Sequence, residues 1–361
     1  MINPIERQTQ NRIIKLFTEQ LNYVYYGNWE KREHNSNVEE EYLSRFLTNK
    51  GYLPNLVKKA VKEVYDLATS NSGNLYDRNK AMYSLLRYGV KARPELGEQF
   101  DTVFPIDWDN WDNNEFGIAE EVTLNKGQHV RRPDVVLYIN GIAIGVLELK
   151  RGTTDIAESI NQSISNQKEL FNQWFYTTVQ LLLAGNNTQG LKYGTIETSA
   201  KYFLSWKEDE QDNSDYKLDK YLKKVCDKQR LIDFLYNGVI FDAGIKKLPR
   251  PHQYFGLKAS QEFVRKKEGG IIWHTQGSGK SLMMVLLGKW ILENVANSRI
   301  VILTDRTELD DQIERVFKDV GETDIAKTRS GKELINFLTS SRPRLVCSLI
   351  HKFGKRGDGE F

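Results

Sequence analysis

The stretch 134–150 (DVVLYINGIAIGVLELK) constrains the fold of this 361-residue chain more than any other part of the sequence. Apolar residues alternate or run together on both sides of Asn140–Gly141, which is typical of paired strands. Asn-Gly is a strong signal for a type I′ turn, because both central positions of that turn require positive φ. We therefore predict a β-hairpin that folds Asp134, at its beginning, back beside Glu148, near its end.

Three charged residues meet at the open end of this predicted hairpin. Glu148 and Lys150 are two positions apart on a strand and so point to the same face, with Asp134 beside them. Two carboxylates can hold Mg²⁺, which prefers oxygen ligands, lowers the pKa of bound water and neutralises a phosphodiester. A lysine can orient that water or stabilise the transition state. We predict a Mg²⁺-dependent catalytic site here; the alternative is a salt-bridged end of a sheet.

Residues 116–167 resemble the PD-(D/E)xK nuclease core in its restriction-endonuclease and RecB-like form. The resemblance implies that Asp134 and Glu148 are metal ligands and that Leu149 gives its backbone carbonyl to the metal. It also implies a glutamate on an early helix. Glu40 is the candidate, with Glu39 and Glu41 as competitors, and a solvated helix start is the alternative for all three.

The helix expected after Lys150 carries one further candidate. RecB-like relatives have a Gln-x-x-x-Tyr pair there; Gln162 matches, but the tyrosine position holds Asn166. Gln162 either contacts DNA, orients the lysine, or is an exposed polar residue of the helix. Arg131 and Arg132, next to the acids, are candidates to bind the DNA backbone, with ordinary solvated surface as the alternative.

A second pattern, GGIIWHTQGSGKSLMMVLL, reads as a strand, a glycine-rich loop and a helix. Backbone N–H groups of such a loop cradle phosphates at a helix N-terminus, and a flexible turn before a core helix is the alternative. His274 replaces the first glycine of the usual motif. Lys280 is expected on the β- and γ-phosphates of ATP and the Ser281 hydroxyl on Mg²⁺. The predicted nucleotide-binding residues here are Thr275, Gln276, Gly277, Ser278, Gly279, Lys280 and Ser281.

WHTQGSGKS resembles the first helicase motif of type I restriction–modification R subunits, within superfamily 2. Gln253, upstream of the loop, resembles the glutamine that reads adenine; a polar loop residue is the alternative. CSLIHKF, ending in Lys352–Phe353, resembles the strand before the acidic box. Between the glycine-rich loop and CSLIHKF, the segment RIVILTDRTELDDQI resembles the helicase motif that follows the first one. It has the family pattern at Asp305, Arg306, Leu309 and Gln312.

These features predict an α/β chain with two domains. Residues 1–240 form a PD-(D/E)xK nuclease domain with N-terminal helices, and 241–361 form a truncated RecA-like motor domain with a parallel sheet. The Pro-containing LPRPH segment lies near the boundary. No acidic box follows Phe353, so we expect a fragment of a longer protein or a truncated gene, able to bind ATP weakly but not to translocate or hydrolyse ATP efficiently.

The resemblance implies the R subunit of a type I restriction enzyme. Such an enzyme couples Mg²⁺-dependent cleavage of double-stranded DNA to ATP-driven translocation, with modification (methyltransferase) and specificity subunits as partners. The rival hypotheses are a nuclease–helicase of a type III-like or repair system, and a DNA-binding or assembly module with idle catalytic sites.

Bulk composition excludes several other classes. Cys226 and Cys347 offer neither a disulfide framework nor zinc spacing. The N-terminus lacks a signal-peptide core and no apolar stretch has membrane-spanning length, so we expect a cytoplasmic protein. The net charge of +3 is small, but residues 244–270 hold seven Lys and Arg against two Glu, which predicts a phosphate-facing surface.

Overall fold

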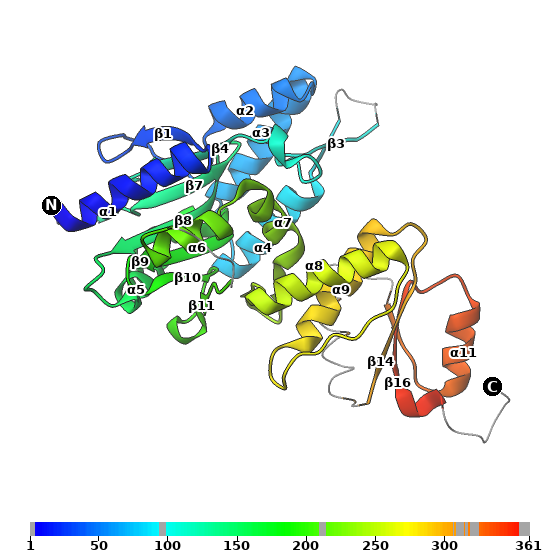
Figure 1. Cartoon of the computed structure of the whole chain (residues 1–361). Coiled ribbons are helices and arrows are strands. Elements are labelled where there is room, and N and C mark those ends of the chain that lie inside the picture. The colour runs from blue at the N-terminus through cyan, green and yellow to red at the C-terminus, as the bar shows by residue number, and fades with distance from the viewer. Residues whose placement is uncertain are drawn as a thin grey trace. The chain divides into compact units, whose positions relative to one another are not determined.

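The computed structural model describes residues 4–93, 99–208, 214–305 and 325–353, together with the single positions 307, 314 and 317. The chain divides into two compact units, Met1–Tyr236 and Asn237–Phe361, which are described separately. The sequence places its predicted boundary at residue 240. Figure 1 shows helices and strands in both units, and the strands of the sheet in the second unit are parallel.

The first unit is built on a seven-stranded sheet with the strand order β1-β4-β7-β8-β9-β10-β11. β1 runs parallel to β4 and β8 runs parallel to β9, while the other neighbours are antiparallel. The strands are β1 (Val24–Asn28), β4 (Phe116–Glu120), β7 (Val135–Ile139), β8 (Ile142–Lys150), β9 (Leu181–Asn186), β10 (Gly190–Gly194) and β11 (Leu204–Ser205).

The predicted hairpin is confirmed as β7 and β8 in the middle of this sheet. Asn140 and Gly141 both have positive φ, 51° and 80°, as a type I′ turn requires. Every residue of β7, and every residue of β8 before Lys150, is buried. A central position therefore explains why these strands are almost continuously apolar.

Helices cover both faces of the sheet. α1 contacts β8, and α6 contacts β10, while α5 packs on β8 and β9 and adds Ile156 and Ile160 to a core with Val146 and Leu182 (Figure 1). The helices are α1 (Pro4–Lys15) with a π-helical turn (Leu16–Gln20), α2 (Glu40–Asn49), α3 (Pro54–Thr69), α4 (Leu75–Tyr88), α5 (Ile156–Asn166), α6 (Lys217–Val225) and α7 (Lys228–Gly238).

Several short elements complete the first unit. The two-stranded ribbons are β2 (Val90–Ala92) with β3 (Asp101–Val103), and β5 (Leu124–Lys126) with β6 (His129–Arg131). Short 3-10 helices occur at Trp111–Asn113, Gln173–Thr177 (η3) and Ala200–Tyr202. The β5–β6 ribbon connects the end of β4 to the start of β7, so it lies at the Asp134 end of the sheet.

The second unit has a three-stranded parallel sheet in the order β14-β16-β15, as the strand–helix alternation predicts. α9 packs on α8, and its Val285 and Leu286 join Ile302 and Leu345 in the core. The elements are β12 (Ile240–Asp242), β13 (Ile245–Lys247), α8 (Pro251–Lys266), α9 (Lys280–Asn294), β14 (Ile300–Thr304), β15 (Ile325–Lys327), α11 (Gly331–Thr339), β16 (Leu345–Leu349) and η5 (Ile350–Phe353).

One sequence prediction about this unit is wrong. Residues 268–275, expected to contain the strand before the glycine-rich loop, have no regular structure, and Ile271 and Trp273 are each 90% exposed. A strand exists only where a neighbour satisfies its backbone hydrogen bonds, and no described strand pairs with this stretch. Within the described part of the chain, no helix has the length and apolar character required to cross a membrane.

Candidate active site

The open end of the β7–β8 hairpin brings the predicted acids together. The register pairs Val135 with Leu147, which sets Asp134 opposite Glu148. The backbone N–H of Leu149 donates to the Asp134 carboxylate at 2.6 Å, and the Glu148 side chain is completely buried. The geometry on which the sequence hypothesis depends is therefore present.

Electrostatics distinguish this pair from an ordinary salt bridge. Burial raises the pKa of Asp134 to about 6, although the Leu149 N–H and the Lys150 charge act in the opposite direction. Burial, and then the charge of Asp134, raise the pKa of Glu148 well above its usual value. Two carboxyl groups that face each other, one of them fully buried, resist ionising together, and a divalent cation would offset that cost.

Lys150 lies at the same end of β8. Its Nζ donates to the carbonyl of Leu149 at 3.0 Å, and its charge lowers the pKa of both acids. Two carboxylates and one carbonyl form an all-oxygen donor set, which fits Mg²⁺. Across the described ranges no cluster of three or more Asp, Glu, His or Cys could hold a metal, so such a site has two acids and needs the carbonyl and water as further ligands.

Helix α5 fixes the orientation of the Glu148 carboxylate. Gln162 Nε2 donates to Glu148 Oε2 at 2.6 Å, and Asn166 Nδ2 donates to Oε1 at 2.9 Å. Gln162 thus holds the acid, a role that differs from the three considered from sequence. Asn166, at the tyrosine position of the family pair, holds the other oxygen. The Asp155 side chain caps the N-terminus of α5 by accepting from the Ala157 N–H.

None of the three early-helix glutamates joins this site. The Glu39 N–H donates to the Gly141 carbonyl at 2.8 Å, and its side chain pairs with Arg32. Glu40 and Glu41 are exposed. All three therefore lie at the turn end of the hairpin, about 16 Å from its open end, because five strand residues rise by about 3.3 Å each.

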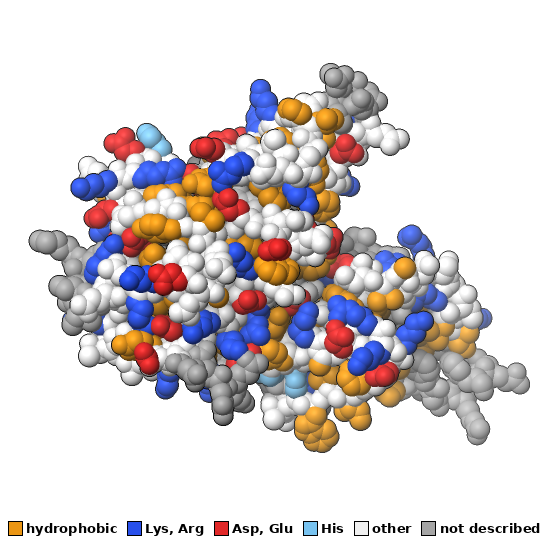
Figure 2. Space-filling view, turned by 45° about the horizontal axis from the view of Figure 1, so that its top comes forward, with side chains coloured by type: hydrophobic (Ala, Val, Ile, Leu, Met, Phe, Trp, Pro, Cys, Tyr) orange, Lys and Arg blue, Asp and Glu red, His pale blue; other side chains and the backbone are white. Residues whose placement is uncertain are grey.

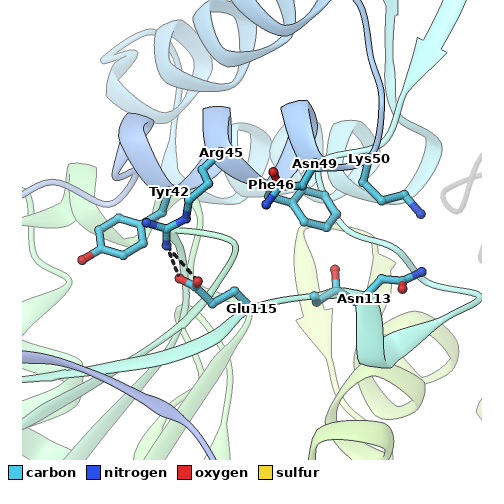
Figure 3. Close-up of a pocket in the computed structure, with 8 residues that line it drawn as sticks. Tyr42, Arg45, Phe46, Asn49, Lys50, Asn113 and Glu115 are labelled. Carbon is cyan, nitrogen blue, oxygen red and sulfur yellow. Dashed lines mark hydrogen bonds and ion pairs between the residues drawn. The ribbon is translucent and has the colours of Figure 1, made fainter.

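A cavity of about 330 Å³ lies at this turn end, and Figure 3 shows the residues that line it. Arg45 on α2 points to Glu115 and donates to both carboxylate oxygens, at 2.9 and 2.8 Å. The Tyr26 hydroxyl also donates to Glu115, at 2.8 Å, and Tyr26 packs on Tyr42. The charge of Glu115 is neutralised by Arg45 within the protein. These contacts therefore connect α2 to the sheet and leave no free charge for a ligand in this cavity.

Two acids near the open end were missed from sequence. The charge of Glu6, on α1, contributes to the raised pKa of Asp134. Glu121, 2% exposed and just beyond β4, raises the pKa of both Asp134 and Glu148. Gln10 ties α1 to this region by donating to the Asp134 carbonyl at 3.3 Å. Only the placement of α1 reveals Glu6, and only the end of β4 at Glu120 reveals the position of Glu121.

In the second unit, the backbone carbonyls of the glycine-rich loop accept hydrogen bonds from nearby side chains. Gly277 and Gly279 have φ of 74° and 82°, and α9 begins at Lys280. Lys280 Nζ donates to the His274 and Thr275 carbonyls, each at 3.0 Å. The amide of Gln253 donates to the Ser278 and Gly279 carbonyls, also at 3.0 Å. Thr275 and Gln276 are exposed, and Ser281 is partly exposed.

The remaining motor-like candidates are only partly described. Asp305 follows β14, while Arg306, Leu309 and Gln312 lie outside the described residues. The backbone of Lys352–Phe353 belongs to η5, and their side chains are likewise outside the described part.

Within the predicted basic surface at 244–270, several of the Lys and Arg side chains are either buried or paired with an acid. Lys246 is buried, which lowers its pKa well below the usual value. Lys247 pairs with Asp242, and Arg265 pairs with Glu262. On the face shown in Figure 2, Lys and Arg side chains are interspersed with Asp and Glu.

Comparison with known proteins gives two family matches. The model for the type I restriction enzyme R protein N terminus matches residues 4–201, more than half of the chain, and the SWI2/SNF2 ATPase model matches residues 252–360. Together the matches fit a nuclease domain followed by a motor domain. The chain belongs to the type I restriction enzyme R protein family.

Curated relatives agree with this assignment. The HindI endonuclease subunit of Haemophilus influenzae is 30% identical over 309 residues, covering 78% of this chain and 28% of the relative. The putative MjaIXP endonuclease subunit of Methanocaldococcus jannaschii is 27% identical over 380 residues, covering 91% of this chain and 36% of the relative. The SsaAORF53P endonuclease subunit of Staphylococcus saprophyticus is 27% identical over 254 residues, covering 69% of this chain and 27% of the relative. The chain thus spans roughly a third of the length of these relatives.

Proposed function

We propose that the first unit is a PD-(D/E)xK-type domain that cleaves double-stranded DNA with Mg²⁺, as part of a type I restriction enzyme. The observation that carries this proposal is that Asp134 and the fully buried Glu148 face each other across the hairpin, with the pKa of both raised. Asp134, Glu148 and the Leu149 carbonyl would hold the metal. Bound there, Mg²⁺ supplies an activated water and neutralises the phosphate.

The protein's own groups prepare this site. The Leu149 N–H holds Asp134, and Gln162 and Asn166 hold Glu148, so both carboxylates have fixed directions. Such preorganisation reduces the reorganisation that a charged transition state would otherwise demand. Lys150, whose ammonium lies on the Leu149 carbonyl, is the donor available to the scissile phosphate or to the attacking water.

The second unit belongs to the same proposal as an ATP-binding part of a RecA-like motor. Lys280 and Ser281 would contact the phosphates and their Mg²⁺, with Gln253 at the adenine. Supporting this, the loop precedes α9 directly and the unit matches the SWI2/SNF2 ATPase model. As in an enzyme of the length of its relatives, this motor would translocate DNA, with modification and specificity subunits as partners.

Replacing Lys150 by alanine tests the nuclease proposal. With plasmid DNA and Mg²⁺, Lys150→Ala should lower cleavage by at least about a hundredfold, since it removes transition-state stabilisation. Binding of a fluorescent ATP analogue should be unchanged. Glu40→Gln, an exposed acid on α2, is the matched control and should cut like the wild type. Equal cleavage by Lys150→Ala and the wild type would reject the site and favour a binding module.

A further inference from the structure

Two adjacent arginines at the nuclease site have different surroundings. Arg132 is held by carboxylates: its Nε lies 3.0 Å from Glu121 Oε2, and its Nη1 pairs with Glu30. No carboxylate within the described ranges pairs with Arg131, and its Nε is buried without a hydrogen-bond acceptor. The sequence makes the two residues equivalent, but only Arg131 has an unmatched charge.

Arg131 is nevertheless fixed in place. Its guanidinium carbon lies 3.6 Å from the centre of the Phe171 ring, and His129 meets the same ring edge-on at 5.5 Å. A guanidinium stacked on an aromatic ring loses little further entropy when it binds, and its planar N–H donors match a phosphate.

The ribbon that carries Arg131 is anchored beside the acids. The buried Asn172 amide donates to the Leu124 carbonyl at 3.4 Å, and Lys126 donates to the Glu169 carbonyl. At the base of the ribbon, the Glu121 N–H donates to the Asp134 carbonyl at 3.0 Å. The β5–β6 ribbon is thus fixed both to the segment after α5 and to Asp134.

Distance and charge indicate what Arg131 contacts. Arg131 lies three positions before Asp134 in the sequence, which is at most about 11 Å of extended chain. Phosphates follow one another by about 3.4 Å along each strand of duplex DNA, so this reach covers about three nucleotides. Between Glu121 and Asp134 the sequence has no acid, but it has Lys126 and His129 as well as the two arginines.

We propose that Arg131 binds a DNA backbone phosphate within about three nucleotides of the scissile bond, and that Arg132 has a structural role. This inference rests on the proposed nuclease function and names the substrate contact of that site. Phe171 is the positioning residue that holds Arg131 ready for the phosphate.

The test measures binding of the full chain to a short fluorescent duplex, in EDTA so that no cleavage occurs, over a range of salt concentrations. Arg131→Gln should weaken binding about tenfold, the value of a lost charged hydrogen bond. It should also reduce the slope of log affinity against log salt by about 0.9, one phosphate contact. Arg131→Lys should have the same salt slope as the wild type, because the charge is kept. Phe171→Leu should bind DNA more weakly than the wild type but with the same salt slope.

Arg132→Gln is the matched control. It should leave the salt slope unchanged and lower the melting temperature, because it removes the closest basic partner of the buried Glu121 and leaves only the more distant Arg7, at 3.9 Å. An unchanged slope for Arg131→Gln, or equal slope changes in the two variants, would overturn the proposal. Cleavage by Lys150→Ala is measured separately. If Lys150→Ala still cleaves DNA while Arg131→Gln changes the salt slope as expected, the nuclease assignment is rejected but the phosphate contact of Arg131 is supported.

Discussion

The acids at the two ends of the β7–β8 hairpin differ in the groups that face them. At the turn end, carboxylates have basic partners: Glu115 binds Arg45, Glu39 binds Arg32, and Asp107 binds Lys50. At the open end, Asp134 and Glu148 face each other, and both have raised pKa values. The ion pairs at the turn end stabilise the fold, while the facing acids at the open end lower its stability unless a cation offsets their charge.

Matched substitutions at the two ends should give the largest contrast. Asp134→Asn should lower DNA cleavage by at least about a hundredfold, by removing a metal ligand. Without metal it should be at least as stable as the wild type, because one of two facing acids becomes neutral. Glu115→Gln should keep cleavage and lose about 1 kcal/mol, since the Arg45 pair is partly exposed. Cleavage assays and urea unfolding in EDTA measure both; the reverse pattern would break the comparison.

The pH dependence of stability should have opposite signs at the two ends. The pKa of Asp134 is raised from 3.8 to about 6, so the folded state keeps a proton that the unfolded chain releases. Its contribution to stability is present below about pH 4 and is lost as pH rises through about 6. Asp107, whose pKa is lowered because hydrogen bonds from Lys50 and Asn113 outweigh its burial, stabilises above its usual pKa and loses this on acidification.

Unfolding of Asp134→Asn and Asp107→Asn across this pH range, in EDTA, measures each contribution by difference from the wild type. If the wild type gained stability relative to Asp134→Asn as pH rose from about 4 to 7, the raised pKa of Asp134 would be contradicted.

Sequence alone predicted what depends on local pattern. The Asn140–Gly141 turn and the alternation around it determined the hairpin, and the hairpin brought Asp134 to Glu148. Contacts made by helices could not be predicted in this way. Whether Asn166 reaches Glu148, and whether α1 or α2 approaches the acids, depends on how those helices pack. The strand expected at 269–275 failed for a related reason, since apolar character alone does not supply a neighbouring strand.

The central claim is that Asp134 and Glu148 hold a divalent cation, and metal binding tests it most directly. Titration of Mg²⁺ into the full chain without nucleotide, followed by calorimetry, compares the wild type with Asp134→Asn and with the control Glu40→Gln. We predict that Asp134→Asn binds Mg²⁺ at least about tenfold more weakly and that Glu40→Gln binds like the wild type. Equal Mg²⁺ affinity in all three proteins would contradict the account.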